Sequence, residues 1–287
     1  MSAILKHELS IYYHSMTAYI FGAFLLIFTG LGALIYNINA SVANFEYVLN
    51  FISIVFVIIV PILTMKVIAD EKRQRTDQLL YALPITTTDV VLGKFFALLV
   101  VYGIPMIIIC LYPLIFALFG DVYLPTSYGC IVAFFFMGAA LIAIGVFISS
   151  LVESQGIAAG LGVVVILFNY YSVTLANYVS SSAVGTLILI VVLAVIIALI
   201  LRALTGSDIV GMAVAAVIIV AAAILFILRQ TLLEGILPSI MKELSLFNHF
   251  STFVNGMFSL TDIVFYLSVI IFFLFMTVQS LEKRRYS

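Results

Sequence analysis

The chain has 287 residues, of which 65% are hydrophobic and 9% are charged, and its mean hydropathy is +1.33. Soluble domains carry roughly a quarter charged residues, so this composition excludes a soluble globular enzyme, and the apolar content excludes intrinsic disorder. The formal net charge of −1 argues against nucleic acid as a partner. The chain is therefore predicted to be an all-α integral membrane protein.

A helix that crosses a bilayer needs about 20 mostly apolar residues, and eight stretches of the chain meet this requirement. They lie at residues 19–38, 48–68, 90–119, 128–151, 156–177, 184–201, 209–228 and 263–279. Pro105 and Pro113 are expected to kink the third stretch. If the hairpin formed by residues 184–228 does not span, the count falls to six and the orientation is unchanged.

Basic residues gather on one side of the predicted membrane. The cytoplasmic side collects Lys6, Lys66, Lys72, Arg73, Arg75, Lys94, Arg202, Lys283, Arg284 and Arg285, and the outer side holds only Arg229 and Lys242. Because Lys and Arg favour the cytoplasmic side, this distribution predicts an even number of crossings with both termini in the cytoplasm. The expected architecture is a polytopic helical bundle.

Three segments are too polar or too mixed to span. Residues 2–16 form a helical stripe suited to the cytoplasmic interface. One face of that stripe carries Ile4, Leu5, Leu9, Tyr12, Tyr13 and Met16, and the other carries Lys6, His7, Ser10 and His14. Residues 69–88 are the most polar part of the chain. Residues 230–261, broken by Pro238, are expected to form one or two amphipathic helices on the outer leaflet or dipping into it.

No catalytic or nucleotide-binding set is found in the sequence. The predicted spans have no Asp or Glu near their centres, which argues against an ion-driven transporter and an intramembrane protease. Gly93 and Lys94 are followed by Phe95 instead of Ser or Thr, so the phosphate-binding loop pattern fails. ATP chemistry must then come from another chain. Asn169, Tyr170 and Tyr171 either line a pathway or make interhelical hydrogen bonds, and the second reading is favoured.

The polar segment 69–88 is the most informative part of the chain. Leu79, Leu80 and Leu83 recur at helical spacing and Pro84 ends the turn. Thr86-x-x-Asp89 then resembles a capping box for the following span. A short amphipathic helix tied to two membrane helices is suited to receive force from a partner. A solvated loop is the alternative.

These residues resemble ABC-2 type permeases, in particular the gliding-motility and copper-maturation branch. The resemblance rests on Glu71-Lys72-Arg73, residues 76–80 (Thr-Asp-Gln-Leu-Leu), Pro84-Ile85 and Leu92-Gly93-Lys94, and on Phe250-x-x-Phe253-x-x-Gly256 near the C-terminal end. Many such permeases carry Gly where this chain has Arg75, and commonly Glu in place of Gln78. They usually have six spans, so the predicted pair at 184–228 would be an inserted hairpin.

The resemblance implies that the whole chain, 1–287, is one permease domain, the membrane half of an exporter. Two permease chains, identical or paralogous, would join two cytosolic ATPase subunits that bind MgATP, and the chain itself would hold no cofactor and catalyse no reaction. The multi-pass protein would lie in a bacterial inner or plasma membrane and move an amphipathic, lipid-like or peptide-like substrate outward. A non-transporting scaffold or sensor that anchors a cytosolic partner is the main alternative.

The resemblance also implies roles for individual residues. The contact with the ATPase would be made by Glu71, Arg73, Thr76, Asp77, Leu79, Leu80, Leu83 and Pro84. In that contact the leucines would fill apolar pockets, while the charged residues would set register and orientation. The outer segment 230–261 would act as a gate or lid that includes Phe250, Phe253 and Gly256.

Overall fold

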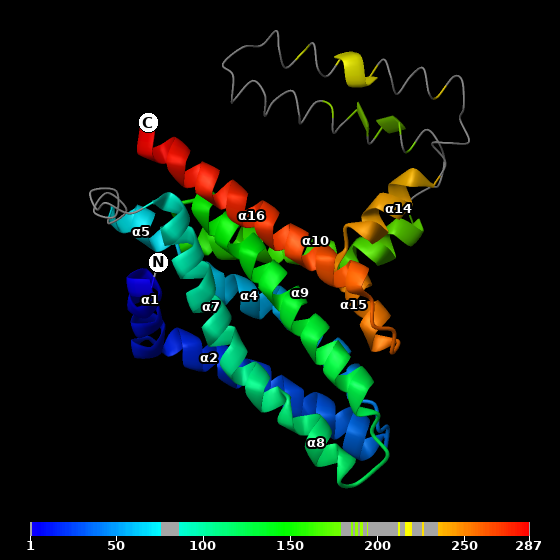
Figure 1. Ribbon diagram of the computed structural model, residues 1–287. Helices are drawn as coiled ribbons and strands as arrows, with labels where there is room; N and C mark the ends of the chain where they lie inside the picture. The colour runs from blue at the N-terminus through cyan, green and yellow to red at the C-terminus, as the bar shows by residue number, and fades with distance from the viewer. Residues whose placement is uncertain are drawn as a thin grey trace. The chain divides into compact units, whose positions relative to one another are not determined.

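The computed structural model describes residues 2–75, 86–178 and 235–286, together with residues 185, 187–188, 190–191, 194, 212, 216–219 and 226. Every regular element within this described part is helical (Figure 1). The chain divides into two compact units, of which the first comprises Met1–Tyr170 with Leu246–Ser287 and the second comprises Tyr171–Ser245. The predicted all-helical membrane architecture is confirmed.

Within each described range, the helices follow one another with short connections. The N-terminal half contains α1 (Ser2–His14), α2 (Met16–Gly32), the π-helix η1 (Ala33–Asn39), α3 (Glu46–Ser53), α4 (Phe56–Thr64) and α5 (Ala69–Gln74). The rest contains α7 (Thr87–Ile109), α8 (Leu111–Ala117), α9 (Leu124–Leu151), α10 (Gln155–Tyr178), α14 (Ile236–Glu243), α15 (Leu246–Val254) and α16 (Leu260–Tyr286). The last residues of α10 and all of α14 belong to the second unit.

Among the described residues, five helices are long and apolar enough to cross a membrane: Met16–Asn39, Thr87–Ala117, Leu124–Leu151, Gln155–Tyr178 and Leu260–Arg284. A sixth candidate is the pair Glu46–Ser53 and Phe56–Gln74, which is bent by 60°. These six coincide with six of the eight predicted spans. The other two, 184–201 and 209–228, lie largely outside the described residues, so the count of eight stays a prediction.

Helix α9 forms the centre of the first unit, where α3, α4, α7, α15 and α16 all pack against it. Every residue from 137 to 146 is buried, and small side chains let the neighbours approach closely. A Cβ atom at Gly138 would lie 2.6 Å from Cζ of Tyr102, and one at Gly145 would lie 2.8 Å from Cβ of Thr64. The Tyr102 hydroxyl donates to the carbonyl of Phe134 at 2.9 Å, which satisfies a fully buried polar group.

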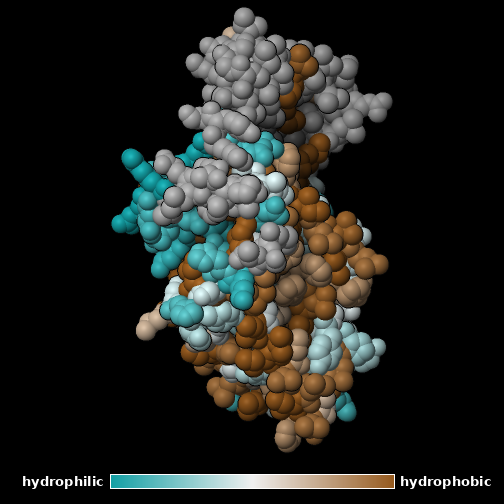
Figure 2. Space-filling model, turned by 60° about the vertical axis from the view of Figure 1, so that its left-hand side comes forward, coloured by the Kyte–Doolittle hydropathy of each residue, from teal (hydrophilic) through white to brown (hydrophobic). Residues whose placement is uncertain are grey.

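The surface of the bundle is largely apolar. Large hydrophobic side chains such as Ile27, Ile107, Val164 and Ile271 are exposed on α2, α7, α10 and α16. Figure 2 shows hydrophilic residues gathered in one region of the visible face and a broad hydrophobic surface elsewhere. Exposed apolar area of this extent is unfavourable in water and is typical of a surface that contacts lipid.

Two local predictions need correction. Pro238 does not break a helix, because it lies in the first turn of α14, where the backbone N–H that proline lacks would have had no intrahelical partner. The interruption comes instead at Leu244 and Ser245. Met16 is not part of the apolar stripe of α1, since that helix ends at His14 and Met16, 79% exposed, begins α2. The third span is interrupted at Cys110, between α7 and α8, three residues before Pro113, which agrees with the expected effect of that proline.

Candidate functional site

The candidate site is the polar segment 69–88, of which the structure describes both ends. Its first part is α5 with Arg75, and its last part leads into α7. Residues 76–85 lie outside the described residues, and so do six of the predicted coupling residues: Thr76, Asp77, Leu79, Leu80, Leu83 and Pro84. Their roles stay predictions. What the structure shows is how the two ends of this segment are attached to the helix bundle.

The start of α5 is capped by a side chain from α9. The backbone N–H groups of Ile68 and Ala69 donate to the hydroxyl of Ser149 at 3.1 and 3.0 Å. Ser149 is fully buried and also donates to the carbonyl of Met65 at 3.3 Å. The ammonium of Lys72 donates to the carbonyl of Ser150. Two of the free N–H groups at this helix N-terminus are thus satisfied by a helix distant in sequence.

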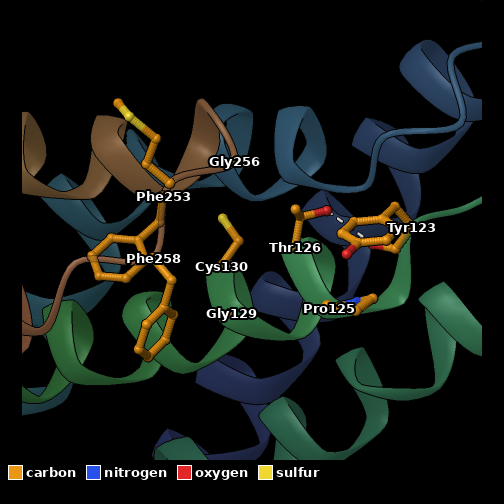
Figure 3. Close-up of a pocket in the computed structure, with 9 residues that line it drawn as sticks. Tyr123, Pro125, Thr126, Gly129, Cys130, Phe253, Gly256 and Phe258 are labelled. Carbon is orange, nitrogen blue, oxygen red and sulfur yellow. Dashed lines mark hydrogen bonds between the residues drawn. The ribbon is translucent and has the colours of Figure 1, made fainter.

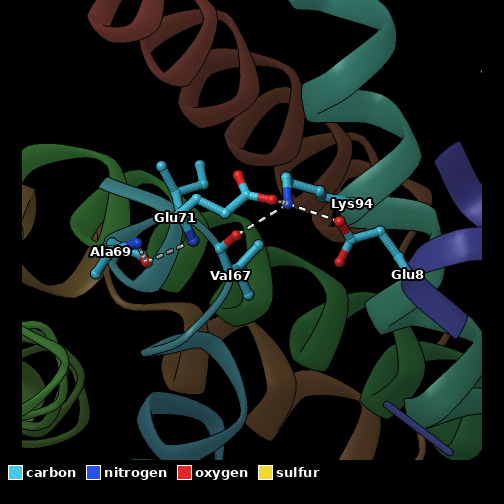
Figure 4. Close-up of polar contacts among 7 residues, drawn as sticks. Glu8, Val67, Ala69, Glu71 and Lys94 are labelled. Carbon is cyan, nitrogen blue, oxygen red and sulfur yellow. Dashed lines mark hydrogen bonds and ion pairs between the residues drawn. The ribbon is translucent and has the colours of Figure 1, made fainter. Parts of the chain in front are cut away.

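A buried lysine joins three helices at the same end of the bundle (Figure 4). The ammonium of Lys94, on α7, lies 2.7 Å from Oε1 of Glu8 on α1 and 2.6 Å from Oε1 of Glu71 on α5. It also donates to the carbonyl of Val67 at 3.1 Å. These three acceptors match the three N–H groups of an ammonium. We call Lys94, Glu8 and Glu71 the lysine cluster.

The lysine cluster is shielded from water. The side chain of Lys94 is 2% exposed, that of Glu8 is 8% exposed and that of Glu71 is 27% exposed. A buried charge is tolerated when it is paired and hydrogen-bonded, as this lysine is. The two carboxylates leave the cluster with a formal charge of −1. Burial and the nearby Glu8 and Glu71 raise the pKa of the Tyr12 hydroxyl on α1.

The end of the segment is attached to α7 and α16. The N–H of Asp89 donates to Oγ1 of Thr86 at 3.1 Å, which confirms the predicted N-cap of α7. The Asp89 carboxylate accepts from the Thr86 hydroxyl at 2.8 Å. The Thr87 hydroxyl donates to Oε1 of Glu282, on α16, at 2.8 Å. The described residues before 76–85 are therefore held by α1, α7 and α9, and those after it by α7 and α16.

This arrangement fastens the ends of the polar segment to several helices. The described part of the chain contains no group of three or more His, Cys, Asp or Glu residues that could hold a metal ion. What the site offers is a short polar segment whose two ends are fastened to helices of membrane length. A displacement of that segment would be passed directly to several of them.

The chain that carries this arrangement matches a known protein family. Residues 6–180 match the family described as ABC-2 family transporter protein, and the match covers more than half of the chain. The chain belongs to the ABC-2 family. It is a membrane permease component of an ABC transporter, a class whose ATP-binding subunit is a partner. No curated protein and no solved structure shows a match. The matched range of this ABC-2 protein contains the whole lysine cluster.

The predicted pathway residues lie on α10. The side-chain oxygen of Asn169 accepts a hydrogen bond from the N–H of Leu246 at 3.0 Å, so this residue makes the interhelical contact that was one of its two predicted roles. The ring of Tyr170 packs edge-on against that of Phe247, with 4.9 Å between centroids. Tyr171 is 44% exposed and belongs to the second unit. Lining of a pathway by these residues stays a prediction.

The predicted gate residues of the ABC-2 protein lie on α15 and in the turn after it. Phe250 and Phe253 are buried, and the ring of Phe250 packs against Phe134 of α9 with 5.6 Å between centroids. Gly256 has φ +80°, a conformation that favours glycine. A pocket of about 200 Å³ separates this turn from the start of α9 (Figure 3). It is lined by Phe253, Gly256 and Phe258 on one side and by Tyr123, Gly129 and Cys130 on the other.

Sequence reasoning missed the buried charged groups. Lys94 was counted as a marker of the cytoplasmic side, although a lysine between Gly93 and Phe95 in an apolar run is itself a sign of an internal partner. Two further polar pairs lie at the end of the bundle opposite the lysine cluster. Nδ1 of His249 lies 2.6 Å from Oδ1 of Asp262, and the Ser127 hydroxyl donates to buried Glu46 at 3.0 Å. Isolated charges flanking apolar runs were the only sequence sign of these contacts.

Proposed function

We propose that this chain is the permease subunit of an ATP-driven exporter in a bacterial cell membrane. Two permease chains would work with two cytosolic ATPase subunits that bind and hydrolyse MgATP. The observation that carries the proposal is that the residues flanking 76–85 are attached to the helix bundle on both sides, in a chain of the ABC-2 family. When the ATPase closes, it moves this segment. That movement favours one of two packing states of the helix bundle.

The ATPase contact is proposed for the segment between the two attached ends. Leu79, Leu80 and Leu83 fill apolar pockets of the ATPase, and Arg73 and Asp77 set its register. Arg73 is exposed, which suits this role. Glu71, by contrast, is paired with Lys94, so its main contribution is to fix the position of α5 at the start of the segment.

The proposed substrate is amphipathic and lipid-like or peptide-like. In the described membrane-length helices, charged side chains lie only near the helix ends, which favours a substrate without high charge. The outer segment 230–261 acts as the gate. Its described part contains α14 and α15, and Phe250 of α15 packs on the central helix α9, so movement of α9 would reach the gate directly.

The test is purification of the tagged chain from its native host in a mild detergent, with identification of the co-purifying proteins and an assay of ATP hydrolysis. The proposal expects a stoichiometric P-loop ATPase whose turnover is inhibited by vanadate. A preparation without an ATPase in two different detergents contradicts it and favours the scaffold alternative. Loss of transport when the catalytic glutamate of the ATPase is replaced would exclude a pure scaffold.

The docking contact is tested separately with a pair of matched variants. Leu80→Asp should abolish co-purification of the ATPase and leave membrane insertion intact, because it places a charge in an apolar contact. Gln78→Asp adds the same charge to the same segment, at a position that is already polar, and should retain the ATPase. Equal co-purification of both variants with the ATPase would contradict the assignment of the leucines.

A further inference from the structure

An apolar groove runs between α7 and α9 within the membrane-length part of the bundle. Its volume is about 590 Å³, which lies in the range of ligand-binding pockets. On α7 it is lined by Val100, Gly103 and Ile104 and reaches Cys110, and on α9 by Val132 and Phe135. All of its lining side chains are apolar apart from the weakly polar thiol of Cys110.

The floor of the groove lies at a glycine, and its rim is made of exposed side chains. Gly103 leaves the floor open, because a Cβ atom at this position would meet no atom within 4 Å. The rim is formed by side chains that are themselves exposed, among them Val100, Ile104 and Val132. The groove therefore opens sideways, toward the surface that contacts the hydrocarbon of the bilayer.

The length of the groove matches one leaflet. Its α7 wall runs from Val100 to Cys110, which is about 15 Å at a rise of 1.5 Å per residue. The hydrocarbon core of a bilayer is about 30 Å thick, so one leaflet contributes about 15 Å. Val100 lies six residues beyond Lys94, about 9 Å along the helix, so the groove occupies the half of the span away from the lysine cluster.

We propose that this groove holds one acyl chain of a membrane phospholipid, from the leaflet on the side opposite the lysine cluster. Ligand pockets for polar molecules carry a few placed polar groups, and the walls of this one offer only apolar side chains besides the Cys110 thiol. A second copy of the chain would contribute a helix that crosses both leaflets, whereas the groove is one leaflet long. Dispersion contacts along the groove hold the acyl chain, and its head group stays at the membrane surface.

The test uses a phosphatidylcholine that carries a photoactivatable diazirine on one acyl chain, in vesicles containing the full-length protein. Crosslinked peptides are mapped by mass spectrometry. The proposal expects labels to concentrate at residues 100–110 and 131–136 of the wild-type chain, at least about fivefold above the lipid-facing residues 160–168 of α10. Labels spread evenly over all lipid-facing helices would overturn it, as would crosslinks between two copies through this face.

Two glycine variants supply the control. Gly103→Leu should fill the groove and reduce its labelling at least about fivefold. Gly160→Leu on α10 also adds a side chain where a Cβ atom would meet no atom within 4 Å, but it lies outside the groove and should leave the labelling unchanged. Equal labelling of the groove in both variants would overturn the proposal. None of these measurements involves an ATPase, so they can fail or succeed independently of the exporter function.

Discussion

Replacing Lys94 by methionine tests the importance of the lysine cluster. Methionine keeps a side chain of similar length and removes the ammonium that joins α1, α5 and α7. Two charge-assisted hydrogen bonds are lost, and two carboxylates are left facing each other without their common partner. Glu71 is 27% exposed and regains some hydration, but the Glu8 side chain, 8% exposed, does not.

The size of the expected destabilisation follows from the burial of the Glu8 side chain. Removing one partner of a buried ion pair typically costs about 3–5 kcal/mol, because the remaining charge is uncompensated. At about 2–4 °C per kcal/mol for a chain of this size, the apparent unfolding temperature should fall by at least about 6 °C. Glu8→Gln should cost less, about 1.5–3 kcal/mol, because the ammonium keeps Glu71 and the Val67 carbonyl.

The assay is thermal unfolding in detergent, followed with a thiol-reactive fluorophore that reports exposure of buried Cys130 and half-buried Cys110. Lys66→Met is the control, since it removes an exposed lysine just before α5. If Lys94→Met unfolds within about 2 °C of this control, the cluster does not stabilise the fold. Adding Glu8→Gln to Lys94→Met should cost less than the sum of the two, since it removes the uncompensated carboxylate.

Three further predictions concern packing, capping and topology. Gly145→Ala should destabilise the protein by about 1–3 kcal/mol through overpacking against α4, whereas Gly103→Ala, which meets no atom within 4 Å, should be neutral in the same assay. Ser149→Ala leaves two N–H groups at the start of α5 without their acceptor, so amide hydrogen exchange there should quicken at least about tenfold; unchanged exchange would contradict the cap. In a chain freed of its native cysteines, cysteine at Ser181 should be labelled from outside and cysteine at Ser207 only after permeabilisation. Labelling of both from one side would reduce the predicted eight spans to six.

The membrane architecture was predictable because its signals are local. An apolar run of about 20 residues is long enough to span by itself, and the described membrane-length helices lie where such runs were found. The 60° bend between Ser53 and Phe56 was not predictable in the same way. Residues 54 and 55 are Ile and Val, so neither glycine nor proline marks the break. The bend arises where α3 and α4 pack on α9, and such contacts leave no local pattern.

The site was predictable as a segment and not as a set of contacts. Glu8 lies 86 residues from Lys94 and Glu71 lies 23 residues away, so no spacing rule connects the three. The structure bears on one departure from the permeases that the chain resembles. Arg75 ends α5 with φ 56°, a left-handed conformation that glycine adopts without strain. The glycine that many of those permeases carry there is thus the residue that the backbone favours.

The burial of α9 constrains any assembly of two such chains. Because residues 137–146 are enclosed on every side by their own chain, this stretch is not available to form the seam between protomers. A partner must dock on helices that still present large apolar side chains outward, and a passage formed between the two protomers would have walls drawn from those helices. In such a dimer, residues 137–146 of each α9 would remain inside their own protomer, and the surrounding helices would make the contacts between protomers.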